Sequence, residues 1–435
     1  MTPEIEKRIK LVKAGKVPAG YKKTRIGVVP EEWRIGDLSE VLELTLREVE
    51  KPSKPYWRVG VRSWAKGTFR AYVDDPSSVD MDTLYQVKEN DLVVSITFAW
   101  EHAIALATKD DDGLLVSHRF PTYVFKKNHL PIFYQKFVSQ PIFKYMLELV
   151  SPGGAGRNRV LDKKNFIKLP CPILKFKEQE KIAEILAAQD RVIELKEKLI
   201  AEKQKQKRCL MHRLLIKDYS LKRFNKIVLN GICIDKNKWS RKRLEEIAKM
   251  SSGSTPRRDC KDNFNGSVQW LSSGELKQKY IVDTEEKLSK DAVRQSNLRI
   301  YKPGTFVIAM YGLEAVGIRG TCSIIQTDCT ISQACMAFTE LKDVINEYLY
   351  YWYLLNGQVI GVKYAQGSKQ QNLNSDLMGK IIVDLPTLPE QQAIAKVLSA
   401  ADEEISLLQK DLEQEKLKKK SLMQLLLTGL VRVSA

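Results

Sequence analysis

Two long stretches of the chain share one pattern of apolar and polar positions. Between residues 177 and 217, and again from residue 389 to residue 428, apolar side chains recur every three or four positions with charged residues between them. This period places the apolar residues on one face of a helix. Pro389 suits a first helical turn, and Gly429 suits a helix C-terminus. The pattern predicts two amphipathic helices of roughly forty residues, each about 60 Å long.

The two predicted helices are copies of one repeat. Their sequences align without a gap at an offset of 212 residues, which places Glu178 on Glu390 and Asp190 on Asp402. The register then holds for about forty residues, over the whole length of both helices. A repeat of this length, which occurs once after each large segment of the chain, implies a protein built from two equivalent halves.

A single apolar stripe cannot bury itself, so we expect the two helices to pack against each other. Connectivity favours an antiparallel pair, because the first helix leads from one large segment to the next and the second begins where that later segment ends. The large segments would then lie at opposite ends of a two-helix spacer and be related by a pseudo-twofold axis. The alternative is that both helices are ordinary core helices of one large domain.

The rest of the chain divides into two segments, each the size of one domain. Trp33 and Trp239 mark their beginnings, and a leucine follows each tryptophan at the same spacing. Short apolar runs broken by Gly, Pro, Asn and Asp indicate irregular sheet. The predicted strands are residues 92–96, 114–116 and 122–125 in the first segment and 306–309, 322–325 and 334–338 in the second, with short helices at 132–150 and 344–360.

We therefore predict an α/β protein with two globules of irregular sheet and short helices, separated by a long antiparallel two-helix coiled coil. The predicted divisions are an N-terminal basic arm at 1–30, a first domain at 31–176, a central helix at 177–217, a second domain at 218–388 with a linker at 218–238, and a C-terminal helix at 389–435.

The charge of the chain points to a polyanionic partner. The formal net charge is +18 and the isoelectric point is about 9.4. The first helical segment holds 11 basic and 7 acidic residues, and the stretch from Pro389 to Ala435 holds 7 of each. Most of the positive charge therefore lies on the globules and the arm. This distribution favours globules that bind nucleic acid and helices that bind protein, although a merely basic soluble protein is the alternative.

Motifs for catalysis, metal binding and membrane insertion are missing from the sequence. There is no P-loop, no Asn/Asp-Pro-Pro-Tyr/Phe run of the adenine-methylating type, and no metal-binding spacing among the four histidines. The seven cysteines contain no Cys-x-x-Cys pair, so we expect most of them to be small apolar core residues. No signal peptide or membrane-length apolar run is present. We expect a non-catalytic, reduced protein of the cytoplasm.

Several motifs resemble one known family. The helix beginnings Lys-Glu-Gln-Glu-Lys-Ile-Ala at 177–183 and Pro-Glu-Gln-Gln-Ala-Ile-Ala at 389–395 resemble the conserved-region signature of specificity subunits of type I restriction–modification enzymes. Four phrases of the second half, at 252–256, 270–276, 302–308 and 367–373, also resemble that family. The first half departs more: no Gly-Ser-Thr-Pro loop follows Leu44, and 153–159 replaces the Gly-Ser-Lys-Gln pattern.

The resemblance implies a DNA-recognition subunit with two target-recognition domains that bind a bipartite, asymmetric site in double-stranded DNA. It also implies two methyltransferase (modification) subunits that methylate adenine, and restriction/translocase subunits that add cleavage. The family implies that this chain holds no catalytic residue, metal or cofactor, and that S-adenosylmethionine, ATP and Mg²⁺ are bound by the partner subunits.

Side chains that form bidentate bonds with bases or pair with phosphates are the candidates for DNA binding. The predicted DNA-binding residues are Arg58, Arg62, Trp64, Lys66, Arg70, Arg157, Asn158, Arg159, Arg257, Arg258, Lys369, Gln370, Gln371 and Asn372. For each of them a phosphate contact or a solvated charge is the alternative, and for tryptophan it is a place in the core. The predicted partner-binding residues on the helices are Ile182, Ile185, Leu186, Ile394, Val397 and Leu398.

Two other classes of function fit the same features. One is an architectural or regulatory DNA-binding protein whose helices mediate self-association. The other is a scaffold whose globules bind protein. Steep salt dependence of DNA affinity would distinguish a DNA reader from the scaffold, and association with an adenine methyltransferase would distinguish the specificity subunit from the architectural protein.

Overall fold

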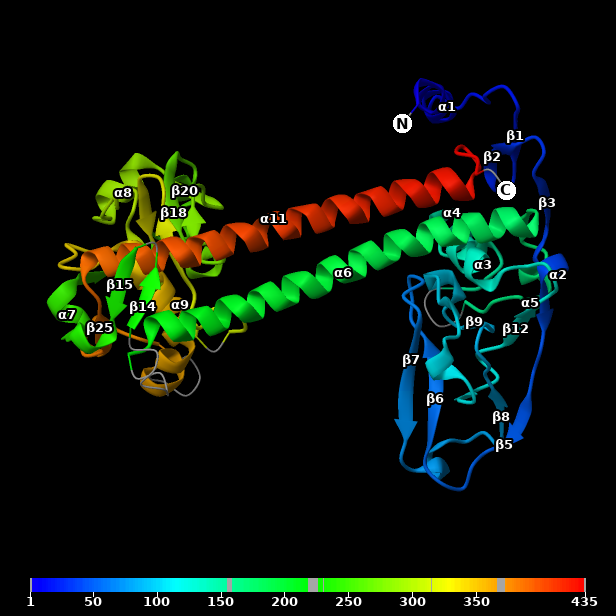
Figure 1. The fold of residues 1–435 in the computed structure, drawn as a ribbon, viewed down its shortest axis with the longest axis horizontal. Helices are drawn as coiled ribbons and strands as arrows, with labels where there is room; N and C mark the ends of the chain where they lie inside the picture. The colour runs from blue at the N-terminus through cyan, green and yellow to red at the C-terminus, as the bar shows by residue number, and fades with distance from the viewer. Residues whose placement is uncertain are drawn as a thin grey trace. The chain divides into compact units, whose positions relative to one another are not determined.

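The structure is a computed structural model that describes residues 2–154, 159–217, 226–229, 231–313, 315–365 and 372–433. The chain forms two compact units. The first unit consists of Met1–Lys196 and Asp411–Ala435, and the second consists of Glu197–Lys410. Each unit holds one globule of sheets and short helices together with half of each long helix (Figure 1).

The two long helices have the predicted length. Helix α6 is Phe176–Leu215 and helix α11 is Leu388–Leu427, with 40 residues each. After α11, Gly429 adopts φ 68°, a left-handed value that glycine accommodates without strain, so the predicted C-terminal stop is confirmed. Because the repeat carries Leu, Glu, Lys and Gln without an internal glycine or proline, nothing in its sequence interrupts either helix.

The helices run antiparallel within each unit. In the first unit Gln189 Nε2 donates to Glu415 Oε2 at 2.6 Å, and Lys196, farther along α6, pairs with Asp411, which is earlier in α11. In the second unit Lys203 pairs with Glu404 at 2.5 Å, and Lys207 pairs with Asp402. As residue numbers rise along α6 they fall along α11, so the predicted antiparallel pair is confirmed (Figure 1).

The globule of the first unit contains two main sheets and two helices that cover them. One sheet has the order β10-β9-β12-β4 and the other β5-β8-β11-β6-β7. Its strands are β3 (Arg34–Asp37), β4 (Leu42–Leu44), β5 (Glu48–Glu50), β6 (Tyr56–Val61), β7 (Thr68–Val73), β8 (Thr83–Gln86), β9 (Leu92–Val94), β10 (Ile104–Leu106), β11 (Leu115–Val116), β12 (Thr122–Phe125) and β13 (Pro170–Ile173), and its helices are α2 (Leu38–Val41), α3 (Pro131–Val138), α4 (Pro141–Leu149) and α5 (Lys163–Phe166).

The globule of the second unit contains a five-stranded sheet, β17-β24-β21-β22-β19, and a three-stranded sheet, β20-β18-β23. Its strands are β14 (Lys226–Leu229), β15 (Ile232–Asp235), β16 (Ser240–Arg243), β17 (Lys249–Ser252), β18 (Val268–Leu271), β19 (Tyr280–Ile281), β20 (Glu286–Leu288), β21 (Phe306–Ala309), β22 (Cys322–Ile325), β23 (Cys329–Ile331), β24 (Cys335–Thr339) and β25 (Ile382–Leu385), and its helices are α7 (Leu244–Ile247), α8 (Lys290–Gln295), α9 (Asn346–Tyr364) and α10 (Ser375–Gly379).

All six predicted strands are present, within two residues of their expected ends. The helix expected at 344–360 is α9, whereas the helix expected at 132–150 is divided into α3 and α4. Pro141 causes this division, because a proline lacks the N–H that a continuing helix needs and is tolerated only in a first turn. The α/β class with two globules and two long antiparallel helices is therefore confirmed.

The predicted N-terminal arm is structured. It contains α1 (Pro3–Lys13) and a hairpin of β1 (Tyr21–Thr24) and β2 (Gly27–Pro30). Val29 is fully buried, and the Tyr21 hydroxyl donates to the carbonyl of Gly429 at 2.9 Å. Residues 21–30 therefore belong to the first unit rather than preceding it. The second unit has a hairpin in the same place along its segment, β14–β15, where the sequence suggested a linker.

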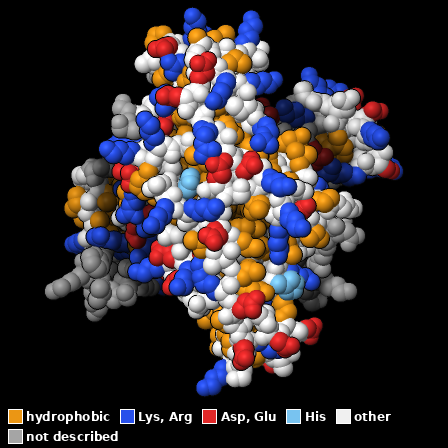
Figure 2. Space-filling view, turned by 90° about the vertical axis from the view of Figure 1, so that its right-hand side faces the viewer, with side chains coloured by type: hydrophobic (Ala, Val, Ile, Leu, Met, Phe, Trp, Pro, Cys, Tyr) orange, Lys and Arg blue, Asp and Glu red, His pale blue; other side chains and the backbone are white. Residues whose placement is uncertain are grey.

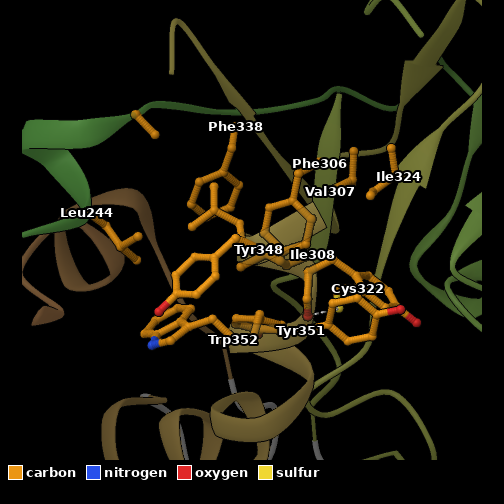
Figure 3. Close-up of a cluster of buried hydrophobic side chains, with 14 of the residues drawn as sticks. Leu244, Phe306, Val307, Ile308, Cys322, Ile324, Phe338, Tyr348, Tyr351 and Trp352 are labelled. Carbon is orange, nitrogen blue, oxygen red and sulfur yellow. Dashed lines mark hydrogen bonds between the residues drawn. The ribbon is translucent and has the colours of Figure 1, made fainter. Parts of the chain in front are cut away.

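Each unit has its own apolar core. In the second unit, Phe306 and Phe338 from the sheet pack against aromatic residues of α9, among them Tyr348 (Figure 3). Cys322 and three other cysteines, Cys171, Cys329 and Cys335, are buried, while Cys209, Cys233 and Cys260 are exposed. Over the described residues, no helix is at once long and apolar enough to cross a membrane.

Candidate functional site

The predicted basic residues of the first unit gather on the hairpin of β6 and β7. Arg58 lies on β6 and Arg70 on β7, and Arg62 and Lys66 lie in the turn that joins them. Arg62 donates to the carbonyl of Thr68 at 2.6 Å, and Arg70 pairs with Asp110 at 3.3 Å. The four cations thus belong to one hairpin at the edge of the five-stranded sheet, where the pairing of Arg58 with Ala71 and of Arg70 with Val59 places Arg58 and Arg70 on opposite faces.

Aromatic side chains accompany these cations. Trp57 on β6 and Tyr72 on β7 face each other across the hairpin, with ring centroids 4.9 Å apart, and both are about half exposed. Trp64 projects from the turn and is 61% exposed. The alternative that Trp57 and Trp64 fill the core is therefore wrong. Exposed aromatic rings among cations are typical of surfaces that bind nucleic acid.

Sequence reasoning missed two residues of this surface. Lys144 on α4 lies over the ring of Trp64, with Nζ 4.8 Å from the ring centroid. Trp100 lies in a short 3-10 helix, Ala99–Glu101, beneath the guanidinium of Arg159 at 5.3 Å. Both residues are far from the hairpin in sequence, and no local pattern connects them to it.

Arg159 has a structural role. Its guanidinium donates to the carbonyl of Glu148, in the last turn of α4, at 3.0 Å. It also donates to the carbonyl of Ser151, just beyond the helix, at 3.2 Å. A cation at this position satisfies carbonyls that the helix leaves free. This arrangement favours capping of α4 over base reading. Arg157 and Asn158 lie outside the described residues.

In the second unit the candidate arginines follow β17 in a tightly held loop. A Cβ on Gly253 would lie 1.8 Å from the carbonyl oxygen of Ile331, so only glycine fits where this loop leaves the sheet. The indole of Trp270 then donates to the carbonyl of Ser254 at 3.1 Å. The Gly-Ser-Thr-Pro phrase therefore forms a fixed platform for the residues that follow it.

The two arginines on this platform differ in environment. Arg258 forms a bidentate pair with Glu286 and lies over the rings of Phe264 and Trp270, at 4.4 and 5.1 Å. The hydrogen bond with Glu286 raises the pKa of Arg258 above its usual value, which keeps the side chain charged. Arg257 is 84% exposed and pairs only locally, with Asp259. Arg257 is thus the more available of the two.

The remaining candidates of the second unit follow α9 (Asn346–Tyr364) in the sequence. Lys369, Gln370 and Gln371 are outside the described residues. Asn372 is described, and its Oδ1 is buried without a hydrogen-bond partner among the described residues.

The predicted partner-binding residues require a correction. Ile182 and Leu186 are buried in the core of the first unit, and Ile394 and Leu398 are buried in that of the second. Their side chains pack against the globules, so no partner can contact them directly. Ile185 and Val397 are partly buried against the same two cores. The apolar stripe of the repeat mainly holds each globule to its helices.

Each unit instead has a groove beside the long helices. In the first unit a groove of about 620 Å³ is lined by Ile26, residues around Pro141 and the C-terminal half of α11. In the second unit a groove of about 490 Å³ is lined by Leu354, Leu355 and the C-terminal half of α6. Five residues of the long helix in each groove match at the offset of the repeat: Lys416, Lys419, Lys420, Met423 and Gln424 in the first unit, and Gln204, Lys207, Arg208, Met211 and His212 in the second. Asp402 and Ile405 of α11 also line the second groove and have no counterpart in the first.

Two basic side chains with shifted pKa values, His102 and Lys279, make hydrogen bonds within their units. Burial lowers the pKa of His102 below its usual value, and burial likewise lowers that of Lys279, whose Nζ donates to Ser399 Oγ at 2.7 Å. Within the described part of the chain, no group of three or more His, Cys, Asp or Glu residues could hold a metal ion. On the face shown in Figure 2, lysine and arginine side chains are widely spread, with acidic residues between them.

Comparison with known protein families agrees with the internal repeat. Residues 30–203 and 236–417 match the family described as the type I restriction modification DNA specificity domain. Together these two stretches span more than half of the chain. Each matched stretch contains one globule and most of the long helix that follows it.

Curated relatives point the same way. The putative type I restriction enzyme MjaX specificity subunit of Methanocaldococcus jannaschii is 25% identical over 437 residues, which covers 95% of this chain and 97% of that protein. The MjaVIII specificity subunit of the same organism is 27% identical over 281 residues, which covers 63% of this chain and 64% of that protein.

Two solved structures share the fold. A chain from a study of complex assembly and conformational transition of the type I R-M system has a TM-score of 0.62 and 16% identity, covering 93% of this chain and 99% of that one. The HsdS subunit from Thermoanaerobacter tengcongensis has a TM-score of 0.51 and 15% identity, covering 96% and 98%. At these identities the likeness concerns the fold.

Proposed function

The chain belongs to the family of type I restriction modification DNA specificity proteins, and we propose that it selects the DNA site for a type I restriction–modification complex. In this proposal each unit binds one half of a bipartite, asymmetric site in double-stranded DNA. Recognition needs polar and charged side chains that reach base edges, and phosphate contacts that set the register. The β6–β7 hairpin and the loop after β17 supply both kinds of side chain.

One observation supports an asymmetric DNA site. The two units share their hairpins, their tryptophans at 33 and 239 and the first turns of their long helices, but their candidate surfaces differ. The first unit presents a ribbon with an exposed turn, and the second presents a loop held by Gly253 and Trp270. Two different surfaces on one repeated framework suit two different half-sites.

The chemistry is assigned to partner subunits. We propose that two methyltransferase subunits, which bind S-adenosylmethionine, methylate adenine at the selected site. Restriction subunits with ATP and Mg²⁺ would add cleavage. This chain would then be a non-catalytic subunit that works in the cytoplasm, where the host DNA is accessible. The family membership and the DNA-binding features of both units support this division of roles.

The paired grooves are the proposed docking surfaces for the two methyltransferase subunits. Each groove combines a methionine, Met423 or Met211, with cations of the same long helix. Such a surface suits an amphipathic helix with acidic residues, because the apolar face fills the groove and the acidic residues pair with its rim. Since the grooves match at the repeat offset, two copies of one partner can bind in equivalent ways.

Co-expression with an adenine methyltransferase subunit of a type I system from the same organism tests this proposal. Long-read methylation mapping should reveal one bipartite motif that is methylated only when both proteins are present. Exchange of residues 31–176 for the same segment of a relative should change one half of the motif and leave the other half unchanged. Methylation without this chain, or a motif that does not respond to the exchange, would contradict the proposal.

A further inference from the structure

Trp64 has an unusual backbone conformation for its residue type. Its φ is 64° and that of Ala65 is 50°, both in the left-handed region. A bulky side chain rarely adopts this region, because its Cβ crowds the following carbonyl. Gly67 in the same turn has φ 84°, where glycine bears no such cost. The turn therefore keeps a strained conformation at an aromatic residue, a feature that is often associated with function.

Hydrogen bonds to the body of the globule maintain this conformation. The backbone amides of Trp64 and Ala65 donate to the carbonyls of Glu101 and His102, each at 2.8 Å. Ser63 Oγ donates to the carboxylate of Glu101 at 2.6 Å. Because three consecutive residues of the turn are tied to one short helix, the turn is held in one position.

The turn is hydrogen-bonded to a buried residue, His102. His102 is 4% exposed, and its Nε2 lies 2.7 Å from the carbonyl of Val138 in α3. His102 thus connects the turn to α3. An exposed side chain on this turn loses little conformational freedom when it binds a ligand.

The indole of Trp64 is the side chain that this framework presents. It is 61% exposed, and Lys144 lies near its ring, 4.8 Å from the centroid. The aromatic residues nearby are less exposed than Trp64: Trp57 and Tyr72 lie against each other, and the ring of Trp100 is partly buried beneath the guanidinium of Arg159. Packing within the globule therefore does not explain why the side chain of Trp64 is exposed on this turn.

We propose that Trp64 is a wedge that inserts against a base step of the half-site bound by the first unit and opens the stack there. This inference rests on the proposed DNA-binding function. Arg62, Lys66 and Lys144 would bind the phosphates on either side, while the indole stacks on one base of the opened step and leaves the other base without its stacking partner. Enzymes that modify a base must remove it from the stack, so a duplex already distorted beside the half-site lowers the cost of that step.

The test uses 2-aminopurine, whose fluorescence rises when it unstacks, in duplexes that carry the methylated motif. The probe replaces one base at a time in and beside both half-sites, and the full chain is used with its methyltransferase subunits. In the wild type we expect one step other than the target adenine to brighten several-fold. Trp64→Gly should abolish this signal and weaken binding roughly tenfold, the scale of one lost base–aromatic stack.

The choice of variants separates the indole from the stability of the turn. Glycine at residue 64 suits the left-handed backbone, so Trp64→Gly keeps the turn while it removes the ring. Trp64→Phe should retain most of the signal, because it keeps a ring that can stack. Tyr145→Ala, which removes an exposed aromatic ring of α4 outside the hairpin, should leave the signal unchanged.

Two outcomes would contradict the proposed role of Trp64. In the first, Trp64→Gly gives the same fluorescence signal as the wild type. In the second, the wild-type complex binds the motif tightly, but only the target adenine brightens. Failure of the proposed function looks different: the wild-type complex would then bind the motif no better than unrelated DNA. The two failures are therefore distinguishable in one set of titrations.

Discussion

Gln179 and Gln391 occupy the same position in their two units and make the same three hydrogen bonds. Gln179 donates to the carbonyls of Asn128 and Leu174, at 3.1 and 2.9 Å, and accepts from the amide of Leu130 at 2.8 Å. Gln391 forms the matching set in the second unit. Both side chains are fully buried. The glutamine of each helix beginning therefore joins a long helix to the loop before a short helix of its globule.

Replacement of Gln391 should be costly. In Gln391→Ala the carbonyls of Asp343 and Pro386 and the amide of Ile345 would lose their buried partner. Each unsatisfied buried group costs about 1–3 kcal/mol, so we expect a loss of roughly 3 kcal/mol, measured by urea unfolding. Gln392→Ala, at an exposed neighbour, should change the free energy of unfolding by less than about 0.5 kcal/mol. Equal stability of the two variants would contradict this role.

The stability of the first unit should fall in mild acid because of His102. Burial lowers the pKa of His102, so the folded state binds a proton less readily than the unfolded state. The stabilisation is complete above the unfolded pKa of about 6.5 and decreases as pH falls below it. His102→Gln, which can still donate to Val138, should flatten this slope between pH 7 and pH 5 in urea midpoints.

The exposed His118 provides the control for this pH dependence. His118→Gln should leave the wild-type slope in place, because the substitution lies at an exposed position and leaves the contact between His102 and Val138 intact. An unchanged slope in His102→Gln would show that other groups cause the pH dependence.

Substitutions of Arg257 and Arg258 should have different effects on DNA affinity and on the stability of the second unit. Arg257→Ala should lower the slope of log affinity against log salt by about 0.9 if its exposed guanidinium contacts one phosphate. Its stability should stay within about 0.5 kcal/mol of the wild type. Arg258→Ala should instead cost about 1 kcal/mol of stability, because it loses Glu286 and the rings of Phe264 and Trp270. Salt titrations and urea unfolding measure the two effects, and the same behaviour in both variants would contradict the assignment.

The paired grooves predict a stepwise loss of partner subunits. Lys420→Glu and Arg208→Glu, each at an exposed rim residue of one groove, should each remove one methyltransferase copy, and the double variant should remove both. A reversed charge at such a rim is expected to weaken docking by at least about tenfold. Native mass spectrometry of the co-expressed complex counts the copies. Lys418→Glu, on α11 outside the groove, should keep both. Retention of two copies in the double variant would place docking elsewhere.

The sequence predicted the framework more accurately than the surfaces. The helices at 176–215 and 388–427 follow from a helical period sustained without glycine or proline, which is a local property. The strands at 306–309 and 322–325 follow from continuous apolar runs for the same reason. Four of the six predicted partner-binding residues are buried in the globule cores, because an apolar stripe shows which face of a helix is buried but does not show what covers it.

The conformation of the candidate surface depended on contacts that are distant in sequence. Trp64 lies in the left-handed region because Glu101 and His102 accept hydrogen bonds from its turn, and nothing in residues 62–67 encodes these acceptors. Arg159 is similar, since only the placement of α4 shows that its guanidinium caps a helix.

By itself the sequence predicted two equivalent halves, two forty-residue antiparallel helices and a basic charge that favours a polyanionic partner, because periodicity, repetition and charge are written along the chain. Only the tertiary structure decided that the helical stripe is covered by the chain's own globules, that equivalent grooves lie beside it, and that Trp64 is held out on a strained turn. These features arise where distant segments meet, and the free energy of those contacts outweighs the local preferences of the residues involved.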